Sequence, residues 1–287
     1  ILGNGDVMSR ADGEEKVKDP VGMRGVRLEA EAILVLGLSP VLRSVKKAVQ
    51  EAGLELERII YSPLAVSRAI LTKKQKELGS AVVDIGATTT SISIWEESDL
   101  KYASVVPVGS GKITDDVAIG LRVSPEISER MKTEHGCCLS ASVSRREQVV
   151  LADWSSNDMV VPKWELARII EARASELLEM VQEEFKKSGK ANLLPAGVVL
   201  AGGGARLEGL AELARKKLKL PVELGQVREV KTDFNEIFTA DAATLTGLLL
   251  YEYDSEQSRG ERAQSVSSDS LGGFWHKIKD WLADLVP

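Results

Sequence analysis

Two segments of the chain place a glycine turn directly after an apolar run, and this arrangement is suited to phosphate binding. The first, VVDIGATTTSISI, begins at Val82, and the second, VVLAGGGARLEGL, begins at Val198. A glycine turn that follows a strand leaves backbone N–H groups free to bind phosphate oxygens. One such turn arises easily by chance, but two of them predict two lobes that face one phosphate-bearing ligand across a cleft.

The first turn carries the side chains with the most specific chemistry. Asp84 ends the apolar run, where a carboxylate is costly unless it meets a metal, a bound water or hydrogen-bond donors. We expect it to orient water around a nucleotide-bound Mg²⁺, with no protein residue binding the metal directly. Gly86 lets the backbone approach phosphate oxygens, and Thr88 and Thr89 offer hydroxyl and N–H donors. The alternative is that Asp84 caps the turn and that the threonines are ordinary strand residues.

The second turn offers backbone in place of side chains. Gly202, Gly203 and Gly204 leave a bare surface at the entrance of a predicted helix, which suits an adenosine or an α-phosphate. A tight strand-to-helix turn is the alternative. On another predicted helix, Arg168 and Glu171 lie three residues apart on one face and are candidates for contacts with the base or ribose. For this pair the alternative is a solvated charged face.

Composition limits the classes of partner. The 287 residues carry a net charge of −6 and a pI near 5.3, which disfavours nucleic acid because phosphate neutralisation needs a basic face. The two cysteines, Cys137 and Cys138, are adjacent and too few for a disulfide framework or a structural zinc site. The chain begins at Ile1 without a signal peptide and has no apolar run of about 18 residues. We therefore expect a cytoplasmic protein, truncated at its N-terminus.

Strands and helices alternate along the chain, and they must position the two turns. This order predicts an α/β fold. Each glycine turn follows one of the strands, and short strands are also expected within 141–162. Helices are predicted at 41–53, 64–78, 113–121, 125–134, 164–187, 207–218 and 245–251, and strands at 26–36, 59–61, 82–85, 100–108, 196–200 and 221–225.

The last part of the chain predicts a linker and a membrane-binding helix. Residues 254–270 contain one apolar residue, Val266, so no core can order them and we expect a disordered linker. In the following GGFWHKIKDWLADLVP, helical spacing gathers the large apolar residues on one face, between two lysines. Such a helix lies in a membrane interface without spanning it; docking on a partner or on its own domain is the alternative. The predicted membrane-binding residues are Phe274, Trp275, Lys277, Ile278, Lys279, Trp281, Leu282 and Leu285.

These motifs resemble those of the actin and Hsp70 ATPase superfamily and, within it, the bacterial FtsA family. VVDIGATTTS is similar to the second phosphate motif, PLAVSRAILTKKQKELG to the first connecting helix, and VVLAGGGARLEGLAELA to the adenosine motif. More specific to the FtsA family are DPVGMRGVRLEAEAILV, MKTEHGCCL, WELARIIEARASELLEMVQEE and the amphipathic end. Together they cover nearly the whole chain in the family's order.

The resemblance implies a partial actin-like (ribonuclease H-like) ATPase fold that includes part of the FtsA-specific 1C (SHS2) subdomain. It also implies that the chain begins inside that inserted subdomain, after the first phosphate loop. The family usually carries DIGGGT where this chain has Ala87 and Thr88. Because a methyl group and a larger side chain replace two glycines, the protein is expected to be at most a weak ATPase, and no catalytic residue is assigned.

Domains follow from the same resemblance. The expected division is 1–60 as the later part of 1C, 61–79 as a remnant of the 1A connecting helix, 80–253 as domain 2 with 2B at 113–187, 254–270 as linker and 271–287 as membrane-targeting helix. The resemblance implies binding of ATP and Mg²⁺, head-to-tail self-association and contacts of 1C with later divisome proteins. Lobe 2B resembles a receptor for the C-terminal peptide of the tubulin-like division protein FtsZ.

The implied role is an adaptor that anchors FtsZ filaments to inner-membrane lipid at the division site. Two other functions remain open from the sequence. A PilM-like pilus-assembly ATPase has a similar phosphate loop but no terminal lipid-binding helix. A sugar kinase shares the fold, but it requires a catalytic carboxylate beside the glycine turns, and the sequence offers no candidate for one.

Overall fold

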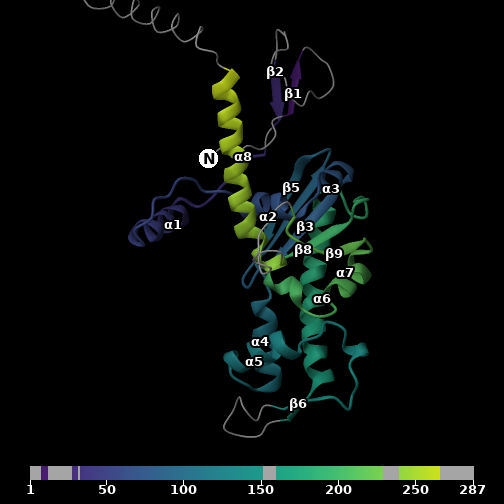
Figure 1. Cartoon of the computed structure of the whole chain (residues 1–287). Coiled ribbons are helices and arrows are strands. Elements are labelled where there is room, and N and C mark those ends of the chain that lie inside the picture. The colour runs from purple at the N-terminus through teal and green to yellow at the C-terminus, as the bar shows by residue number, and fades with distance from the viewer. Residues whose placement is uncertain (1–7, 12–27, 32, 151–159, 229–238, 266–287) are drawn as a thin grey trace, which may run out of the picture.

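A mixed five-stranded sheet forms the centre of the protein. The computed structural model describes residues 8–11, 28–31, 33–150, 160–228 and 239–265 (Figure 1). The central strand β3 is parallel to its neighbour β8, β9 is parallel to β8, and β4 and β5 continue the sheet in antiparallel fashion on the other side of β3. The predicted α/β class is confirmed. The strand order is β5 (Asp99–Val106), β4 (Thr90–Glu96), β3 (Ser80–Ile85), β8 (Val198–Ala201) and β9 (Val222–Leu224).

Helices cover both faces of this sheet because side chains along each strand alternate between two cores. Val83 and Leu200 belong to the larger core, which includes α4 (Gly111–Leu121), α6 (Lys163–Lys187) and α7 (Leu210–Leu218). Val82 and Val199 face the smaller core, formed with α2 (Ser62–Ile70) and the start of α8 (Ala243–Ser265). A Cβ on Gly247 of α8 would lie 1.9 Å from the carbonyl oxygen of Ala65, so these two helices touch through their backbones.

Helix α6 connects the sheet to a second lobe. The apolar stripe predicted for this helix is confirmed, since eight of its residues are buried. Figure 1 shows α6 running from the sheet to the end of the molecule where α4, α5 (Pro125–His135) and β6 lie. Strand β6 (Gln148–Val150) pairs with β7 (Val160–Pro162), which confirms the short strands predicted here. The 3₁₀ turn Ser140–Ser142 lies against α6 in the same lobe.

The segment before β3 corrects two predictions. The expected helix 64–78 is two helices, α2 and α3 (Lys73–Leu78). Thr72 causes the break, because its side chain accepts from the Gln75 N–H while the Gln75 side chain accepts from the Thr72 N–H, which starts a new helix. The strand predicted at 59–61 is also wrong. These residues are in no strand, since the described residues offer them no strand partner.

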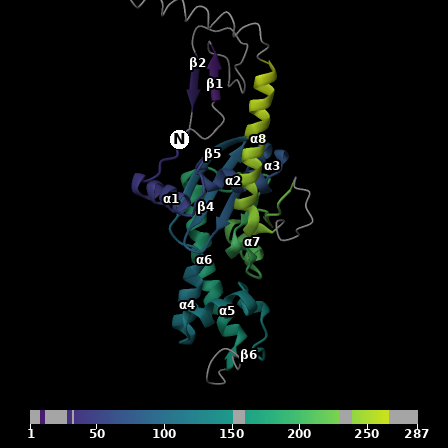
Figure 2. The same ribbon diagram turned by 60° about the vertical axis from the view of Figure 1, so that its left-hand side comes forward.

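The described residues before Tyr61, namely 8–11, 28–31 and 33–60, form an arm beside the body. Strand β2 (Leu28–Glu31) is shorter than the predicted strand 26–36, and its one strand partner among the described residues is β1 (Met8–Ala11). Helix α1 (Ser39–Glu51) forms as predicted but buries no residue. Figure 2 shows α1 projecting to one side of the body, and β1 and β2 beyond the end opposite α4 and α5.

Helix α8 is longer than the sequence predicted. The expected linker begins at Asp254, whereas the helix continues to Ser265 (Figure 1). Composition predicts what can be buried, but a helix already nucleated by packing extends at little cost. Arg68 contributes to that packing through a bidentate ion pair with Asp254, at 2.6 and 3.2 Å. The remainder of the predicted linker, 266–270, lies outside the described residues.

Candidate functional site

The two glycine turns lie side by side at the C-terminal ends of two neighbouring interior strands, β3 and β8. They follow the C-terminal ends of β3 and β8, whose register pairs Asp84 with Ala201. Gly202 has φ of +81°, and a Cβ there would lie 2.4 Å from the Asp84 carboxylate and 2.5 Å from the Ile85 carbonyl oxygen. Only glycine tolerates both the backbone angle and this contact. The fold thus brings together Asp84 and Gly202, which are far apart in the sequence.

Asp84 is a partly buried carboxylate at the end of β3. Burial raises its pKa above the ordinary value. Among the described residues, no side chain or backbone group forms a hydrogen bond or ion pair with it. A carboxylate that costs free energy to bury and has no such partner is available to a ligand, which is the situation expected for orienting a hydrated cation.

The first turn is tight but open to solvent. The Gly86 N–H donates to the Thr89 carbonyl at 2.9 Å, which closes the turn. Ala87, Thr88 and Thr89 are all exposed. Ala87 and Thr88 both keep negative φ, so the two positions where the sequence departs from glycine are not strained. The threonine hydroxyls and the backbone of the turn are therefore available to a ligand.

The second turn leads into a 3₁₀ helix, Gly203–Arg206, ahead of α7. A Cβ on Gly203 would meet nothing within 4 Å, whereas one on Gly204 would lie 2.5 Å from Ile85 Cγ2. Gly203 is thus open, and Gly204 is required for close packing against the first turn. Gly204 therefore has a packing role in the turn and Gly203 is exposed backbone, while the adenosine contacts of both stay a prediction.

Arg168 and Glu171 have partners within their own lobe. Glu171 accepts hydrogen bonds from the Ser140 N–H, at 2.8 Å, and from its hydroxyl. The Arg168 guanidinium lies 5.5 Å from the ring centroid of Trp164. These contacts explain both residues without a ligand, and their adenosine contacts stay a prediction.

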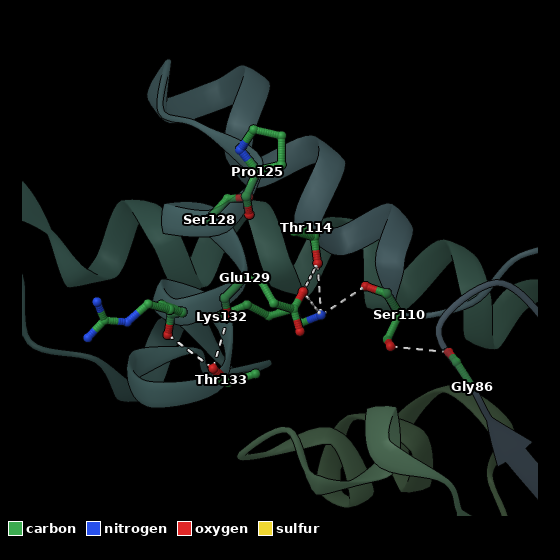
Figure 3. A network of polar contacts seen from close by, with 9 residues as sticks. Gly86, Ser110, Thr114, Pro125, Ser128, Glu129, Lys132 and Thr133 are labelled. Atoms are coloured by element: carbon green, nitrogen blue, oxygen red, sulfur yellow. Dashed lines mark hydrogen bonds and ion pairs between the residues drawn. The ribbon is translucent and has the colours of Figure 1, made fainter. Parts of the chain in front are cut away.

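A buried polar network between α4 and α5 was not predicted from the sequence (Figure 3). Lys132, only 5% exposed, donates to the Glu129 carboxylate at 2.6 Å and to the Thr114 hydroxyl at 2.8 Å. Thr114 also bonds Glu129. Burial alone raises the pKa of Glu129, but the bonds from Lys132 and Thr114 outweigh it and lower that pKa. The available signal was the ExxK spacing from Glu129 to Lys132 within a helix, and such a spacing is short and common.

Ser110 was also missed, although it touches the first turn. Its N–H and hydroxyl both donate to the Gly86 carbonyl, at 2.8 and 3.1 Å. The Gly109-Ser110-Gly111 segment joins β5 to α4, and this third strand–glycine–helix junction repeats the pattern of the two turns already identified. That repetition was the signal in the sequence.

Other chemistry is limited in the part of the chain that the structure describes. Burial raises the pKa of the Cys138 thiol to about 12, so it is not a reactive nucleophile. Across the described ranges, no cluster of His, Cys, Asp and Glu is arranged to hold a metal ion. Nor does any helix in those ranges combine the length and apolar character needed to cross a bilayer. The predicted membrane-binding residues, from Phe274 to Leu285, lie outside the described residues.

Family comparisons match most of the chain. A family model described as "Cell division protein FtsA" matches residues 81–247, and one described as "Hsp70 protein" matches residues 42–103. FtsA of Pseudomonas aeruginosa is 35% identical over 276 residues, covering 94% of this chain and 66% of that protein. FtsA of Bacillus subtilis is 35% identical over 249 residues, covering 86% of this chain and 55% of that protein. The chain thus spans less than two thirds of these relatives' length.

Solved structures agree on the fold. MreB5 of Spiroplasma citri bound to ADP superposes with a TM-score of 0.61 and 16% identity, covering 78% of this chain and 68% of that one. The PilM–PilN type IV pilus biogenesis complex gives a TM-score of 0.54 and 21% identity, covering 73% and 57%. At such identities the likeness concerns the fold alone. The fold is that of the actin-like ATPases, as predicted.

Proposed function

Because this chain belongs to the FtsA family of cell division proteins, we propose that it is an ATP-binding, actin-like adaptor. It polymerises at the cytoplasmic face of the bacterial inner membrane, anchors FtsZ filaments there and recruits later divisome proteins. Its work is mechanical, with weak ATP hydrolysis at most. The observation that carries the nucleotide part is the contact between Asp84 and Gly202, which joins the two turns into one site.

ATP binds in this proposal with its phosphates at the first turn and its adenosine at the second. Asp84 orients water on the nucleotide's Mg²⁺, while Thr88, Thr89 and the Gly86 turn receive phosphate oxygens. The exposed backbone of Gly203 is proposed to contact the adenosine. The structures of MreB5 bound to ADP and of MreB 5 bound to AMPPNP, which share the fold, support a nucleotide ligand.

A titration with a fluorescent ribose-labelled ATP tests this site. The 287-residue chain with Mg²⁺ is expected to bind with Kd on the order of 1 mM or tighter. Asp84→Asn should weaken binding at least threefold when Mg²⁺ is present and much less in EDTA. Glu183→Gln, an exposed acid-to-amide change at the end of α6, is the control and should leave Kd unchanged. No saturable binding by the unmodified chain would overturn the nucleotide assignment.

The domain assignment remains part of the proposal, with 1–60 as 1C, 61–79 from 1A, 80–253 as domain 2 and 113–187 as lobe 2B. The second lobe, in which α4, α5 and the β6–β7 pair gather around the part of α6 that lies away from the sheet, supports the division between 2A and 2B (Figure 1). Helix α2 packs on the sheet of domain 2. This packing supports a connecting role for 61–79.

Lobe 2B is proposed to receive the FtsZ C-terminal peptide, and 1C to make head-to-tail and late-division contacts. The double helical filament of MamK, which shares the fold with a TM-score of 0.54, supports self-assembly. A pull-down with immobilised FtsZ C-terminal peptide, with and without ATP, tests the first contact. The FtsZ peptide should capture the chain and a scrambled peptide should not. Free FtsZ peptide should reduce this capture by competition. Equal retention on a scrambled peptide would remove FtsZ from the proposal.

Segment 271–287 is proposed to attach the protein to inner-membrane lipid. Vesicle flotation of the full chain should be reduced at least fivefold by Trp281→Asp, because a charge enters the predicted apolar face. Ala283→Asp adds the same charge to the opposite, polar face and should float almost as well as the unmodified chain. Equal flotation of all three would contradict the membrane role.

Membership of the FtsA family favours the adaptor over a PilM-like ATPase and over a sugar kinase. The sugar-kinase alternative predicts ATP turnover that rises when a sugar is added. We expect no such rise. Robust stimulation by any common hexose would replace the adaptor assignment with a metabolic one.

A further inference from the structure

The start of α4 holds the first glycine turn through its carbonyl oxygens. The Ser110 N–H and hydroxyl donate to the Gly86 carbonyl, and the Gly111 N–H donates to the Ala87 carbonyl at 2.8 Å. A Cβ on Gly109 would lie 2.5 Å from the Gly86 carbonyl oxygen, so the two backbones are in direct contact. The turn is therefore bound to α4 by consecutive peptide groups.

The hydrogen bonds from the start of α4 fix the direction of two N–H groups in the first turn. In a trans peptide the C=O of one residue and the N–H of the next point in opposite directions. Because the Gly86 and Ala87 carbonyls point to α4, the N–H groups of Ala87 and Thr88 point away from it. Neither N–H has an acceptor among the described residues, and both residues are exposed. Adjacent, unpaired N–H groups aimed in a fixed direction form an anion-binding arrangement.

Ser110 also contacts the second turn. A Cβ on Gly204 would lie 2.9 Å from the Ser110 Cβ and 3.0 Å from the Ile85 carbonyl oxygen. Ser110 is itself buried. One residue therefore lies between the two turns, and its displacement would alter both.

Lys132 connects Ser110 to the second lobe. Its ammonium donates to the Ser110 carbonyl at 3.4 Å, in addition to Thr114 on α4 and Glu129 on α5 (Figure 3). A buried ammonium is costly unless its donors are bonded, so loss of one acceptor disturbs the others. The phosphate turn, the start of α4 and helix α5 thus share one hydrogen-bonded chain.

We propose that Ser110 is a positioning residue that aims the Ala87 and Thr88 N–H groups at a nucleotide phosphate, and that Lys132 transmits phosphate occupancy to the α4–α5 lobe. The inference rests on the proposed nucleotide function and deepens it. A phosphate that binds the two N–H groups strengthens the opposite carbonyl bonds to Ser110 and Gly111 through the same peptides. By thermodynamic reciprocity, whatever orders α4 and α5 must then tighten nucleotide binding.

Two variants separate aiming from transmission. Ser110→Ala keeps the Cβ and the N–H bond but removes the hydroxyl bond to Gly86, and it should weaken ATP binding about threefold to tenfold. Lys132→Met removes the ammonium and should change ATP affinity less. It should instead abolish the slowing of amide exchange in 111–135 that ATP causes in the unmodified chain. Ser44→Ala and Lys186→Met, both exposed, are matched controls and should behave as the unmodified chain.

Hydrogen–deuterium exchange with and without ATP, alongside the nucleotide titration, decides between the outcomes. Full ATP-dependent protection of 111–135 in Lys132→Met, with unchanged affinity in Ser110→Ala, would overturn the inference while the nucleotide site stands. No ATP binding by the unmodified chain would overturn the proposed function first. If Lys132→Met does not fold by circular dichroism, Lys132→Arg replaces it. Its bulkier group should displace the Ser110 contact, and undiminished protection would again overturn the link.

Discussion

Helices α6 and α1 both carry apolar residues at helical spacing, but they differ in what covers those residues. In α6, eight residues of the helix are buried, and Phe185 is only 1% exposed. In α1 none is buried, and Val41 and Val45 are 55% and 46% exposed. Periodicity therefore predicts a helix and an apolar face equally well in both, whereas burial depends on which other segments reach that face. Apolar residues stabilise the body only where such a partner is present.

The largest effect should come from removing a buried side chain of α6. Phe185→Ala leaves a cavity in the larger core and should cost about 3–5 kcal/mol of unfolding free energy. Urea denaturation followed by circular dichroism measures it. A cost below about 1 kcal/mol would show that α6 is not fixed to the sheet as the buried stripe indicates.

The polar side of α6 should contribute less. Arg173 binds both carboxylate oxygens of Asp116 on α4, at 2.6 and 3.1 Å, and both side chains are more than a quarter exposed. Arg173→Met should cost about 1 kcal/mol, decreasing at high salt. Arg173→Lys serves as a control that keeps the charge but loses the bidentate geometry. A double-mutant cycle with Asp116→Asn that gives no coupling would contradict the contact.

Replacing Asp84 should raise the stability of the folded protein. Burial raises the pKa of Asp84, so the folded state binds its proton more tightly than the unfolded chain does. Stability from this group is therefore present below the ordinary pKa of 3.8 and is lost as pH rises through the raised folded value. Asp84→Asn should stabilise the protein by roughly 1 kcal/mol at pH 7, as is common for functional residues. The gain should vanish below the ordinary pKa, and a pH-independent difference in thermal midpoint would contradict this cause.

The smallest effect is expected in α1. Val45→Ala removes methyl groups that already contact solvent, so the change in unfolding free energy should stay within about 0.5 kcal/mol. The comparison with Phe185→Ala in one denaturation series is direct. A cost near that of Phe185 would show that another segment covers α1 in solution.

The sequence allowed prediction of the features that depend on local pattern. The α6 stripe, helix α7 after the second turn and the edge strand β9 follow from periodicity and turn residues, and the two turns proved to be neighbours. The break at Thr72 had a visible signal in the Thr72–Gln75 spacing, but continuous apolar periodicity concealed it. The strand expected at 59–61 required a pairing partner, which no local pattern supplies.

The missed site residues share one cause. Ser110 and Lys132 acquire their roles from the register of β3 with β8 and from the packing of α5 on α4, which bring distant segments into contact. Glycine-rich turns can be recognised in a sequence because their unusual backbone requires glycine. A serine or lysine that supports such a turn from behind has no unusual composition around it, so only the tertiary structure identifies it.

Helix α8 projects from the body in a direction that its packing on α2 sets. From Asp254, which pairs with Arg68, to Ser265 the helix extends about 16 Å at 1.5 Å per residue. A rod of this kind carries direction as well as distance. A force applied at the C-terminal end of α8 would therefore act on α2 and the sheet as a torque, through the backbone contact at Gly247.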